Sequence, residues 1–235
     1  MPEKQIDLSI ILPSYLEEEN LRLLLPRLND VLEGLGLVSE ILVVDTIAPL
    51  DATEQVCAEF GAVYVTRAPG NVFGDAVRTG IQRAQGKWVL FMDADGSHAP
   101  EFVKSLWEEA PENDIVIASR YVDGGYTENS APLRLMSRVL NWTYSLILNL
   151  PYKDVSNSFK LYRASLLKSL HLRCDNFDVV EEILYKIVRT HPKLRVKEIP
   201  FSFKKRMFGE TKRNLVLFII TYLVTMIRLR LSSLD

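Results

Sequence analysis

The stretch Trp88–Pro100, WVLFMDADGSHAP, decides the fold that the sequence predicts. Its first five residues are all apolar, as in a strand that is buried on both faces of a parallel sheet. Two carboxylates, Asp93 and Asp95, come next, and the glycine and serine after them are typical of a turn. In an open α/β sheet the ligand crevice lies outside the carboxyl ends of the strands. We therefore expect both acids at that edge.

The composition is that of an ordinary globular protein. Of the 235 residues, 48% are hydrophobic and 25% are charged, which is enough for one substantial core. The formal net charge of -2 gives no reason to expect nucleic acid as a partner. Two cysteines, Cys57 and Cys174, lie far apart, which argues against a disulfide scaffold and fits a reducing compartment. The N-terminal residues carry charges and no apolar segment, so we expect no secretory signal.

The first half of the chain alternates between strand and helix patterns. Strands are predicted over residues 8–12, 41–44, 62–65, 88–92 and 115–118, and helices over residues 21–32, 52–60, 75–84 and 101–109. This order predicts a wound, mainly parallel α/β sheet flanked by helices. Later in the chain we expect a loop or lid over residues 121–132, helices over 133–150 and 179–189, and an extended segment over 194–203.

The C-terminal segment is unusually apolar. Residues 215–227 are almost all apolar and have basic residues on both sides. Thirteen helical residues at about 1.5 Å each span roughly 20 Å, less than the ~30 Å hydrocarbon core of a bilayer. We therefore predict a main domain over residues 1–212, and over 213–235 a helix that docks on a membrane interface or on a partner. The basic flanks favour an anionic lipid surface. The alternative is a helix packed into the protein's own core or into a dimer interface.

Acidic residues follow several of the predicted strands. Asp93 and Asp95 stand one residue apart, and two such carboxylates can bind one hard cation, Mg²⁺ or Mn²⁺. Three histidines and two cysteines in the whole chain make a zinc site an unattractive alternative. Glu17 follows the first strand and Asp45 ends the second, which would bring them to the same edge. Each acid alone has an ordinary explanation, as a turn former or as an acid in the first turn of a helix.

Two common phosphate-binding motifs are missing from the sequence. The loop after the first strand, PSYLEEEN over residues 13–20, contains no glycine, which disfavours a dinucleotide-binding dehydrogenase. No glycine-rich segment ends in Gly-Lys-Ser/Thr, so a P-loop is absent too. A site in which a metal neutralises the phosphates is then expected, as for a nucleoside diphosphate leaving group.

Seven segments resemble one enzyme family, in the right order along almost the whole chain. They are PSYLEEEN, VVD, RAPGNVFGDAVRTGIQRAQGKWVLFMDADGSHAPE, ASRYVDGG, RLMSRVLN, DVSNSFKLYR and KEIPFSFKKRMFGETK. Together they are similar to family-two inverting glycosyltransferases of the GT-A fold, and most similar to the group of dolichol-phosphate mannose synthases and other polyprenyl-phosphate glycosyltransferases.

The resemblance implies a function and a set of site residues. The implied reaction is metal-dependent inverting transfer of a sugar, with mannose favoured, from a nucleotide sugar, with GDP-mannose favoured, to a polyprenyl phosphate. The implied place is the cytoplasmic side of a membrane, with the protein held peripherally by the membrane surface, by an anchoring partner or as a homo-oligomer. The implied residues are Pro13, Tyr15, Glu17, Asp45, Gly74 and Asp93 for the nucleotide sugar; Asp93 and Asp95 for Mg²⁺ or Mn²⁺; Arg120, Arg134, Ser137 and Arg138 for the acceptor phosphate; and Asp95, Asp154, Arg206 and Lys212 for catalysis.

Four departures from the family pattern leave the sugar and the nucleobase open. Residues 45–49, DTIAP, stand where the family commonly has Asp-Asp-Gly-Ser. Leu16 replaces a usual Asn, Ser97 replaces a Gln that often completes the metal shell, and Asn157 replaces a usual Gly.

Two alternative functions remain open at the level of the sequence. One is a glycosyltransferase that acts on a saccharide or protein hydroxyl. Such an acceptor would require a carboxylate base, for which Asp154, Glu181 and Glu182 are candidates. The other is a non-catalytic protein that binds a nucleotide sugar and docks on a membrane.

Overall fold

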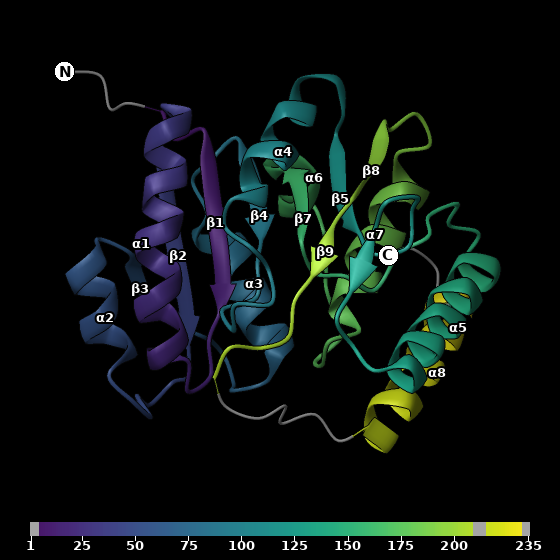
Figure 1. Cartoon of the computed structure of the whole chain (residues 1–235). Helices are drawn as coiled ribbons and strands as arrows, with labels where there is room; N and C mark the ends of the chain where they lie inside the picture. Colours follow the sequence, from purple (N-terminus) through teal and green to yellow (C-terminus); the bar gives the residue numbers. More distant parts are fainter. Residues whose placement is uncertain (1–4, 209–214, 232–235) are drawn as a thin grey trace.

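The protein is built around a seven-stranded sheet with helices on both faces (Figure 1). The structure, a computed structural model, describes residues 5–208 and 215–231, and in the last helix it describes the side chains from residue 221 onward. The strands are β1 (Leu8–Pro13), β2 (Ser39–Asp45), β3 (Val63–Thr66), β4 (Trp88–Phe91), β5 (Ile115–Ser119), β6 (Tyr126–Thr127), β7 (Lys160–Arg163), β8 (Val196–Pro200) and β9 (Ser202–Phe203). The helices are α1 (Glu18–Leu35), α2 (Thr53–Phe60), α3 (Phe73–Arg83), α4 (Phe102–Glu109), α5 (Ala131–Leu148), α6 (Ala164–Lys168), α7 (Val179–Thr190) and α8 (Leu215–Leu231).

The wound, mainly parallel sheet expected from the sequence is confirmed. The strand order is β3-β2-β1-β4-β7-β5-β8, and the pairs among β1, β2, β3 and β4 are parallel, as is β5 with β8. β7 is antiparallel to both of its neighbours, β4 and β5. No strand was expected at this position from the sequence. The segment predicted as a loop over residues 121–132 contains the short strand β6, which pairs with β9.

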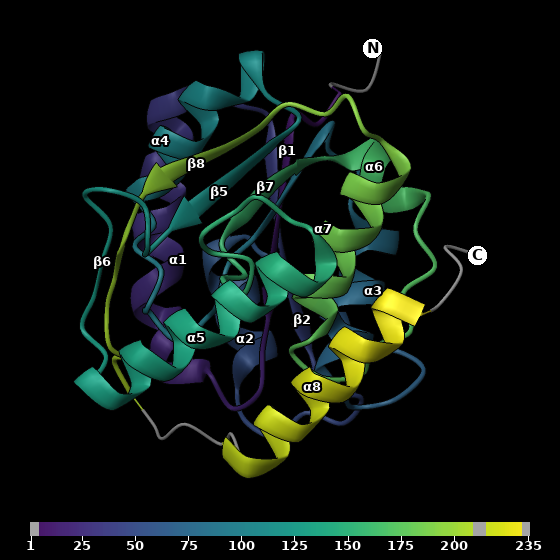
Figure 2. The ribbon, with the colours of Figure 1, turned by 90° about the vertical axis from the view of Figure 1, so that its right-hand side faces the viewer.

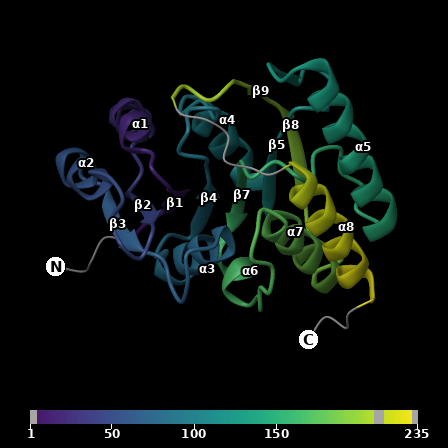
Figure 3. The same ribbon diagram turned by 90° about the horizontal axis from the view of Figure 1, so that it is seen from below.

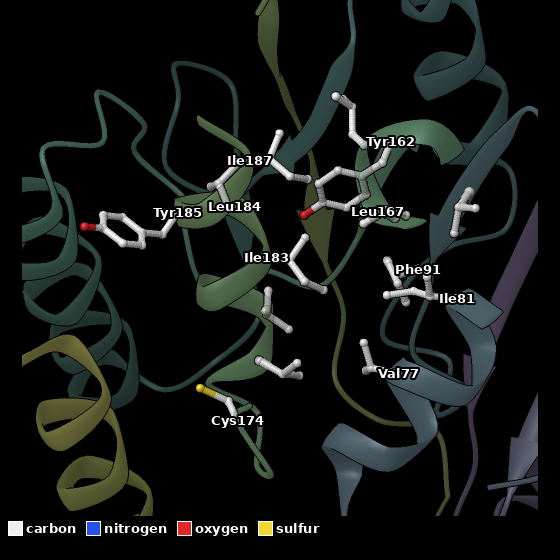
Figure 4. Close-up of a cluster of buried hydrophobic side chains, with 14 of the residues drawn as sticks. Val77, Ile81, Phe91, Tyr162, Leu167, Cys174, Ile183, Leu184, Tyr185 and Ile187 are labelled. Atoms are coloured by element: carbon white, nitrogen blue, oxygen red, sulfur yellow. The ribbon is translucent and has the colours of Figure 1, made fainter. Parts of the chain in front are cut away.

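Two hydrophobic clusters hold the layers together because side chains alternate along each strand. Leu8, Ile10 and Leu12 of β1 pack with α1, α2 and α4, whereas Ile11 faces the cluster that includes α3, α6 and α7 (Figure 4). β4 divides in the same way: Trp88 and Leu90 point to one cluster, and Val89 and Phe91 to the other. Figure 3 shows α1 and α4 on one side of the sheet and α3, α6 and α7 on the other.

The C-terminal helix α8 packs one face against the protein itself. Tyr222, Met226 and Leu229 are buried, and the Tyr144 hydroxyl of α5 donates a hydrogen bond to the Tyr222 carbonyl at 3.0 Å. Thr225 Oγ1 donates to Asp178 at the start of α7. In Figure 2, α5, α7 and α8 face the viewer at the β8 end of the sheet. The packed face agrees with the alternative of a helix in the protein's own core.

The same helix leaves its other face exposed. Leu223, Val224, Ile227 and Leu231 are between 45% and 79% exposed. Within the described ranges, no helix is both long and apolar enough to cross a membrane. The predicted domain boundary at residue 212 lies outside the described residues.

Two buried ionisable side chains, one on β7 and one on α7, influence each other's protonation. Lys160 of β7 and Glu181 of α7 are both fully buried. Burial lowers the pKa of Lys160 to about 8, against the opposing charge of Glu181. Burial likewise raises the pKa of Glu181 to about 8, against the opposing charge of Lys160, while Asp178 adds a smaller upward shift. The Lys160 ammonium also donates to the carbonyls of Val155 and Asn157, which anchors the loop before β7.

We predict that Met226→Ala lowers the free energy of unfolding by about 2–5 kcal/mol, because it leaves a cavity between α8 and the rest of the protein. Urea unfolding followed by circular dichroism measures this loss. Val224→Ala is the matched control on the exposed face of the same helix and should change stability by no more than about 0.5 kcal/mol. Equal, small losses in both variants would contradict the docking of α8.

We predict that Glu181→Gln stabilises the protein more at pH 8.5 than at pH 5.5. A carboxyl whose folded pKa is raised binds its proton in the folded state. Wild-type stability should therefore fall between pH 4.5, the ordinary value, and about pH 8, the folded value. Glutamine removes this loss. Urea unfolding at both pH values tests the prediction, with the exposed Glu108→Gln as control. A difference between variant and wild type that is the same at both pH values would contradict it.

Candidate active site at the carboxyl edge of the sheet

A cleft of about 780 Å³ opens at the carboxyl ends of β1 and β4. Its walls come from many parts of the chain, among them the loop after β1, the turn after β4, the segments that follow β3, β5 and β9, the loop before β7, and the helices α5, α7 and α8. Residues that line it include Pro13, Tyr15, Glu17, Arg67, Asp93, Asp95, Ser97, Arg120, Ser137, Ser156, Ser158 and Arg206. The edge of the sheet that the sequence analysis singled out is therefore a real cleft.

The turn after β4 is held in place by its own hydrogen bonds. The main-chain N–H of Asp93 donates to Nδ1 of the fully buried His98 at 2.9 Å. Burial lowers the pKa of His98, and the ring is neutral because Nδ1 accepts this bond. Gly96 adopts φ 78°, a left-handed conformation that favours glycine. The turn is thus fixed by the strand before it and by the imidazole after it.

A serine hydroxyl holds one oxygen of each acid. Ser158 Oγ donates to Oδ1 of Asp93 at 2.8 Å, and Ser97 Oγ donates to Oδ1 of Asp95 at 2.6 Å. Each carboxylate therefore keeps its Oδ2 for another partner. Ser97, which stands where the family often has a metal-binding Gln, is bonded to Asp95.

The donor chemistry of this pair fits a hard divalent cation. Asp93 and Asp95 offer carboxylate oxygens, the ligands that Mg²⁺ and Mn²⁺ prefer. Nowhere in residues 5–208 and 215–231 do three His, Cys, Asp or Glu side chains gather into a group that could hold a metal ion. The pair therefore suits an ion that takes its other ligands from substrate phosphates and water, as Mg²⁺ commonly does.

Arg206 lies between two of the predicted site acids. Its guanidinium pairs with Glu17 at 2.7 Å and with Oδ2 of Asp95 at 3.3 Å. Burial raises the pKa of Glu17, and the bond from Arg206 opposes that rise. Glu17 also accepts a bond from Asn20 at 2.6 Å. Lys212, the other predicted cation, lies outside the described residues.

Arg120 and Asp154 form a buried ion pair at the opposite wall. The guanidinium donates two bonds to the carboxylate, at 2.7 and 2.8 Å, and the Arg120 main-chain N–H donates a third at 2.8 Å. Although burial alone would lower the pKa of Arg120, the charge and bonds of Asp154 raise it overall. Arg120 lines the cleft, whereas Asp154 is fully buried and lies behind it. Asp154 is thus the counterion of Arg120.

The other predicted acceptor residues are divided between the cleft and the surface. Ser137 lines the cleft. Arg134 and Arg138 are exposed on α5 and do not line it. The Arg138 guanidinium lies 5.6 Å from the ring centre of Tyr121.

The predicted nucleotide residues are divided in a similar way. Pro13, Tyr15, Glu17 and Asp93 line the cleft. Asp45 is buried at the end of β2, where it accepts a bond from the Tyr64 hydroxyl at 3.2 Å and burial raises its pKa. Gly74 packs against the 174–175 loop, and its N–H donates to the Asp175 carbonyl at 2.8 Å. Neither of these two residues lines the cleft. Glu181 and Glu182, the candidate bases for a hydroxyl acceptor, are buried away from it as well.

Arg67 is a cleft residue that the sequence analysis missed. Its buried guanidinium donates to the carbonyls of Ser14, Val44 and Asp45, which joins the carboxyl ends of β1 and β2. It also reaches the Asn71 carbonyl at 3.2 Å. The only signal in the sequence was its place in the RAPG segment, which marks a turn but not a contact across the sheet edge.

The chain is similar to enzymes that transfer sugars to polyprenyl phosphates. The sequence profile named Glycosyl transferase family 2 matches residues 9–170. Dolichol-phosphate mannosyltransferase of Pyrococcus furiosus is 34% identical over 87% of this chain, which spans 58% of that protein's length. Undecaprenyl-phosphate mannosyltransferase of Micrococcus luteus is 32% identical over 87% of this chain and 86% of that protein. Dolichol-phosphate mannosyltransferase of Saccharomyces cerevisiae is 26% identical, over 88% and 81%.

Solved structures share the fold. Glucosyl-3-phosphoglycerate synthase from Mycobacterium tuberculosis, crystallised with Mn²⁺, UDP and glucosyl-3-phosphoglycerate, matches with a TM-score of 0.71 at 20% identity, over 96% of this chain and 80% of that chain. The same enzyme with Mg²⁺ and UDP matches with a TM-score of 0.70 at 19% identity, over 94% and 79%. These matches confirm the GT-A fold that the sequence predicted. With the family profile and the relatives above, they show that the chain belongs to glycosyl transferase family 2.

Proposed function

We propose that the protein transfers a sugar from a nucleotide sugar to a polyprenyl phosphate at a membrane surface, with a divalent metal at Asp93 and Asp95. The observation that carries the proposal is the two-sided cleft. Carboxylates lie along one wall, and a buried, paired arginine and an apolar surface lie along the other. Mannose as the sugar and GDP-mannose as the donor are supported by the names of the relatives from Pyrococcus, Micrococcus and Saccharomyces.

The acidic wall suits the donor. A bound Mg²⁺ or Mn²⁺ would neutralise the departing diphosphate. Arg206 lines the same wall and carries the positive charge that a diphosphate attracts, and Lys212 is proposed to add a second. Tyr15 is 43% exposed at the cleft and offers a ring for the nucleoside. Asp45 and Gly74 would then support the nucleotide pocket from behind its surface.

The opposite wall suits a phosphate acceptor. Arg120, Ser137 and Ser156 line it, and their side chains carry donors that a phosphate oxygen accepts. A phosphate is already an anion near pH 7, so it needs positioning rather than a general base. Asp154, fully bonded to Arg120, would act by holding that guanidinium in position. Arg134 and Arg138 would attract the anionic headgroup from the exposed part of α5.

The reaction is a single inverting displacement. An oxygen of the acceptor phosphate attacks the anomeric carbon while the bond from that carbon to the nucleoside diphosphate breaks. The diphosphate takes the bonding electron pair and leaves. Charge develops on the diphosphate at the wall where Arg206 lies, which is where stabilisation of the transition state is needed.

An apolar part of the cleft suits the lipid chain. Leu133, Met136 and Leu140 of α5, Val180 of α7 and Tyr222 of α8 line it. These helices lie at the same end of the molecule (Figure 2). A polyprenyl chain bound there would leave its phosphate beside Arg120.

The outer faces of α5 and α8 suit a membrane surface. Leu135, Val139, Trp142 and Leu146 of α5 are between 54% and 66% exposed and recur at helical spacing. The neighbouring helix α8 carries its own exposed apolar residues, Leu223, Val224, Ile227 and Leu231 (Figure 3). Exposed apolar patches of this kind mark interaction sites, and Arg134, Arg138, Arg228 and Arg230 on the same two helices favour anionic lipid. We therefore propose peripheral attachment on the cytoplasmic side, with residues 213–235 as part of the attachment.

We predict that Asp95→Ala lowers transfer to a polyprenyl phosphate in lipid vesicles by about a hundredfold or more, because stabilisation of the leaving diphosphate is lost. Transfer of radiolabelled sugar in the presence of Mg²⁺ measures the loss. Glu108→Ala, an exposed acid on α4 that does not line the cleft, is the control and should keep full activity.

The same assay separates the alternatives. Undiminished transfer by the Asp95→Ala variant would overturn the proposed function. Wild-type transfer to a saccharide or protein hydroxyl and none to the lipid phosphate would support a glycosyltransferase that acts on hydroxyl acceptors. Binding of a nucleotide sugar without turnover on any acceptor would support a non-catalytic binding protein.

We predict that Trp142→Glu and Ile227→Glu each weaken binding to anionic vesicles severalfold, since each places a charge on the apolar outer face of α5 or α8. Vesicle co-sedimentation measures binding. Leu50→Glu is the matched control, because Leu50 is 51% exposed and lies in the loop between β2 and α2. An equal effect of all three substitutions would point to net charge rather than to this surface.

A further inference from the structure

The segment Lys204–Phe208 crosses the acidic turn that follows β4. After β9 the chain runs toward the carboxyl end of β1 (Figure 1). On the way, the N–H of Lys204 donates to the Ser97 carbonyl at 3.1 Å, and the N–H of Met207 donates to the Asp95 carbonyl at 3.0 Å. We call residues 204–208 the strap. These main-chain bonds place the strap over the acids whatever its side chains are.

Contacts at Met207 and Phe208 also hold the strap against the turn and against α1. A Cβ at Gly96 would collide with the Met207 side chain. The Phe208 N–H donates to Oδ1 of Asn20 at 3.1 Å, which joins the far end of the strap to α1. The strap is therefore held on both sides of Arg206.

Arg206 contacts the oxygen of Asp95 that a metal would need. Ser97 donates from both its N–H and its hydroxyl to Oδ1 of Asp95. The Arg206 guanidinium takes the other oxygen, Oδ2, at 3.3 Å. Its remaining nitrogens bind Glu17, at 2.7 and 3.3 Å. Both side chains of the Arg206–Asp95 pair are about one-fifth exposed, so water screens this contact only partly.

We propose that Arg206 holds the metal-binding oxygen of Asp95 in the unloaded protein and yields it only when a nucleoside diphosphate arrives, so that metal and diphosphate bind as a unit. This inference deepens the proposed function and rests on it. Without a diphosphate, a metal must displace a guanidinium to gain two protein carboxylates. When a diphosphate is bound, Arg206 has another anion to pair with, and the metal gains phosphate ligands.

The physical basis is competition between two cations for one carboxylate. Glu17, Asp93 and Asp95 bring three acidic groups to the donor wall, and Arg206 is the cation that touches two of them. Glu17 keeps Arg206 nearby after Asp95 is released, so displacement is a short movement rather than an opening of the strap. Linkage then requires that diphosphate strengthens metal binding and that metal strengthens diphosphate binding by the same factor.

The test is direct titration of Mn²⁺ into the metal-free protein, with free Mn²⁺ followed by electron paramagnetic resonance. We expect Arg206→Gln to bind Mn²⁺ about fivefold or more tightly than wild type without nucleotide, a size that corresponds to about 1 kcal/mol. Lys204→Gln is the matched control. It removes one positive charge from the same strap, and Lys204 is exposed and forms no ion pair with Glu17 or Asp95. We expect its Mn²⁺ affinity to stay within about twofold of wild type, as for a screened surface charge.

A second titration measures the coupling. GDP and UDP, each at a saturating concentration, should strengthen Mn²⁺ binding more in wild type than in Arg206→Gln. Only in wild type can the diphosphate draw the Arg206 guanidinium away from Asp95. Thermal unfolding of each variant confirms that it is folded.

The outcomes separate this inference from the proposed function. A Mn²⁺ affinity of Arg206→Gln without nucleotide that is no greater than that of wild type overturns the inference, including the case in which neither binds at millimolar metal. An equal gain in Lys204→Gln overturns it too, since general charge would then explain the effect. Glycosyl transfer would stand in both cases. Absence of Mn²⁺ binding to every variant even with GDP or UDP would instead contradict the metal dependence of the proposed function.

Discussion

The site depends on the burial of β4. This strand bonds to β1 on one side and to β7 on the other, and its side chains enter a hydrophobic cluster on each face of the sheet. A strand enclosed in this way cannot shift by one residue without turning both of its apolar sets to the wrong layer. Asp93 and Asp95 therefore leave the sheet at a fixed point. The cleft, the strap and the serine contacts are all arranged around that point.

The parts of the fold that could be predicted from the sequence are those whose signals are local. Apolar runs of β1, β2, β4 and β5 and the spacing of leucines in α1 each lie within a few residues, and the acids after β4 are visible in one short turn. β7 gave no such signal, because its four residues, KLYR, include a lysine and an arginine. Its place between β4 and β5 is decided by pairing with strands far away in the sequence. The buried Lys160 is tolerated there because its ammonium group donates to the carbonyls of Val155 and Asn157, and because the charge of Glu181 favours its protonated form.

The candidate site shows the same limit. The motif order placed Asp93, Asp95, Glu17 and Arg206 in one region, and these residues do lie together. It did not distinguish a side chain in the cleft from one that supports the cleft. Both carboxylate oxygens of Asp154 accept hydrogen bonds from Arg120. A buried guanidinium needs such a counterion because low-polarity surroundings penalise an isolated charge. α8 was equally ambiguous, since an apolar helix can pack inward or face lipid. In this fold one face of α8 packs against the protein, and the opposite face is exposed.

The hydrogen bonds of Arg67 affect which parts of the sheet edge depend on side chains. Its bonds go to main-chain carbonyls of Ser14, Val44, Asp45 and Asn71, and a carbonyl is present whatever side chain its residue carries. The carboxyl ends of β1 and β2 and the loop after β3 are therefore held together whatever side chains these segments carry. The departure of residues 45–49 from the Asp-Asp-Gly-Ser pattern therefore leaves the bonds from Arg67 to this edge of the sheet in place. One arginine thus makes the closure of this edge of the sheet independent of the side chains that the neighbouring loops carry.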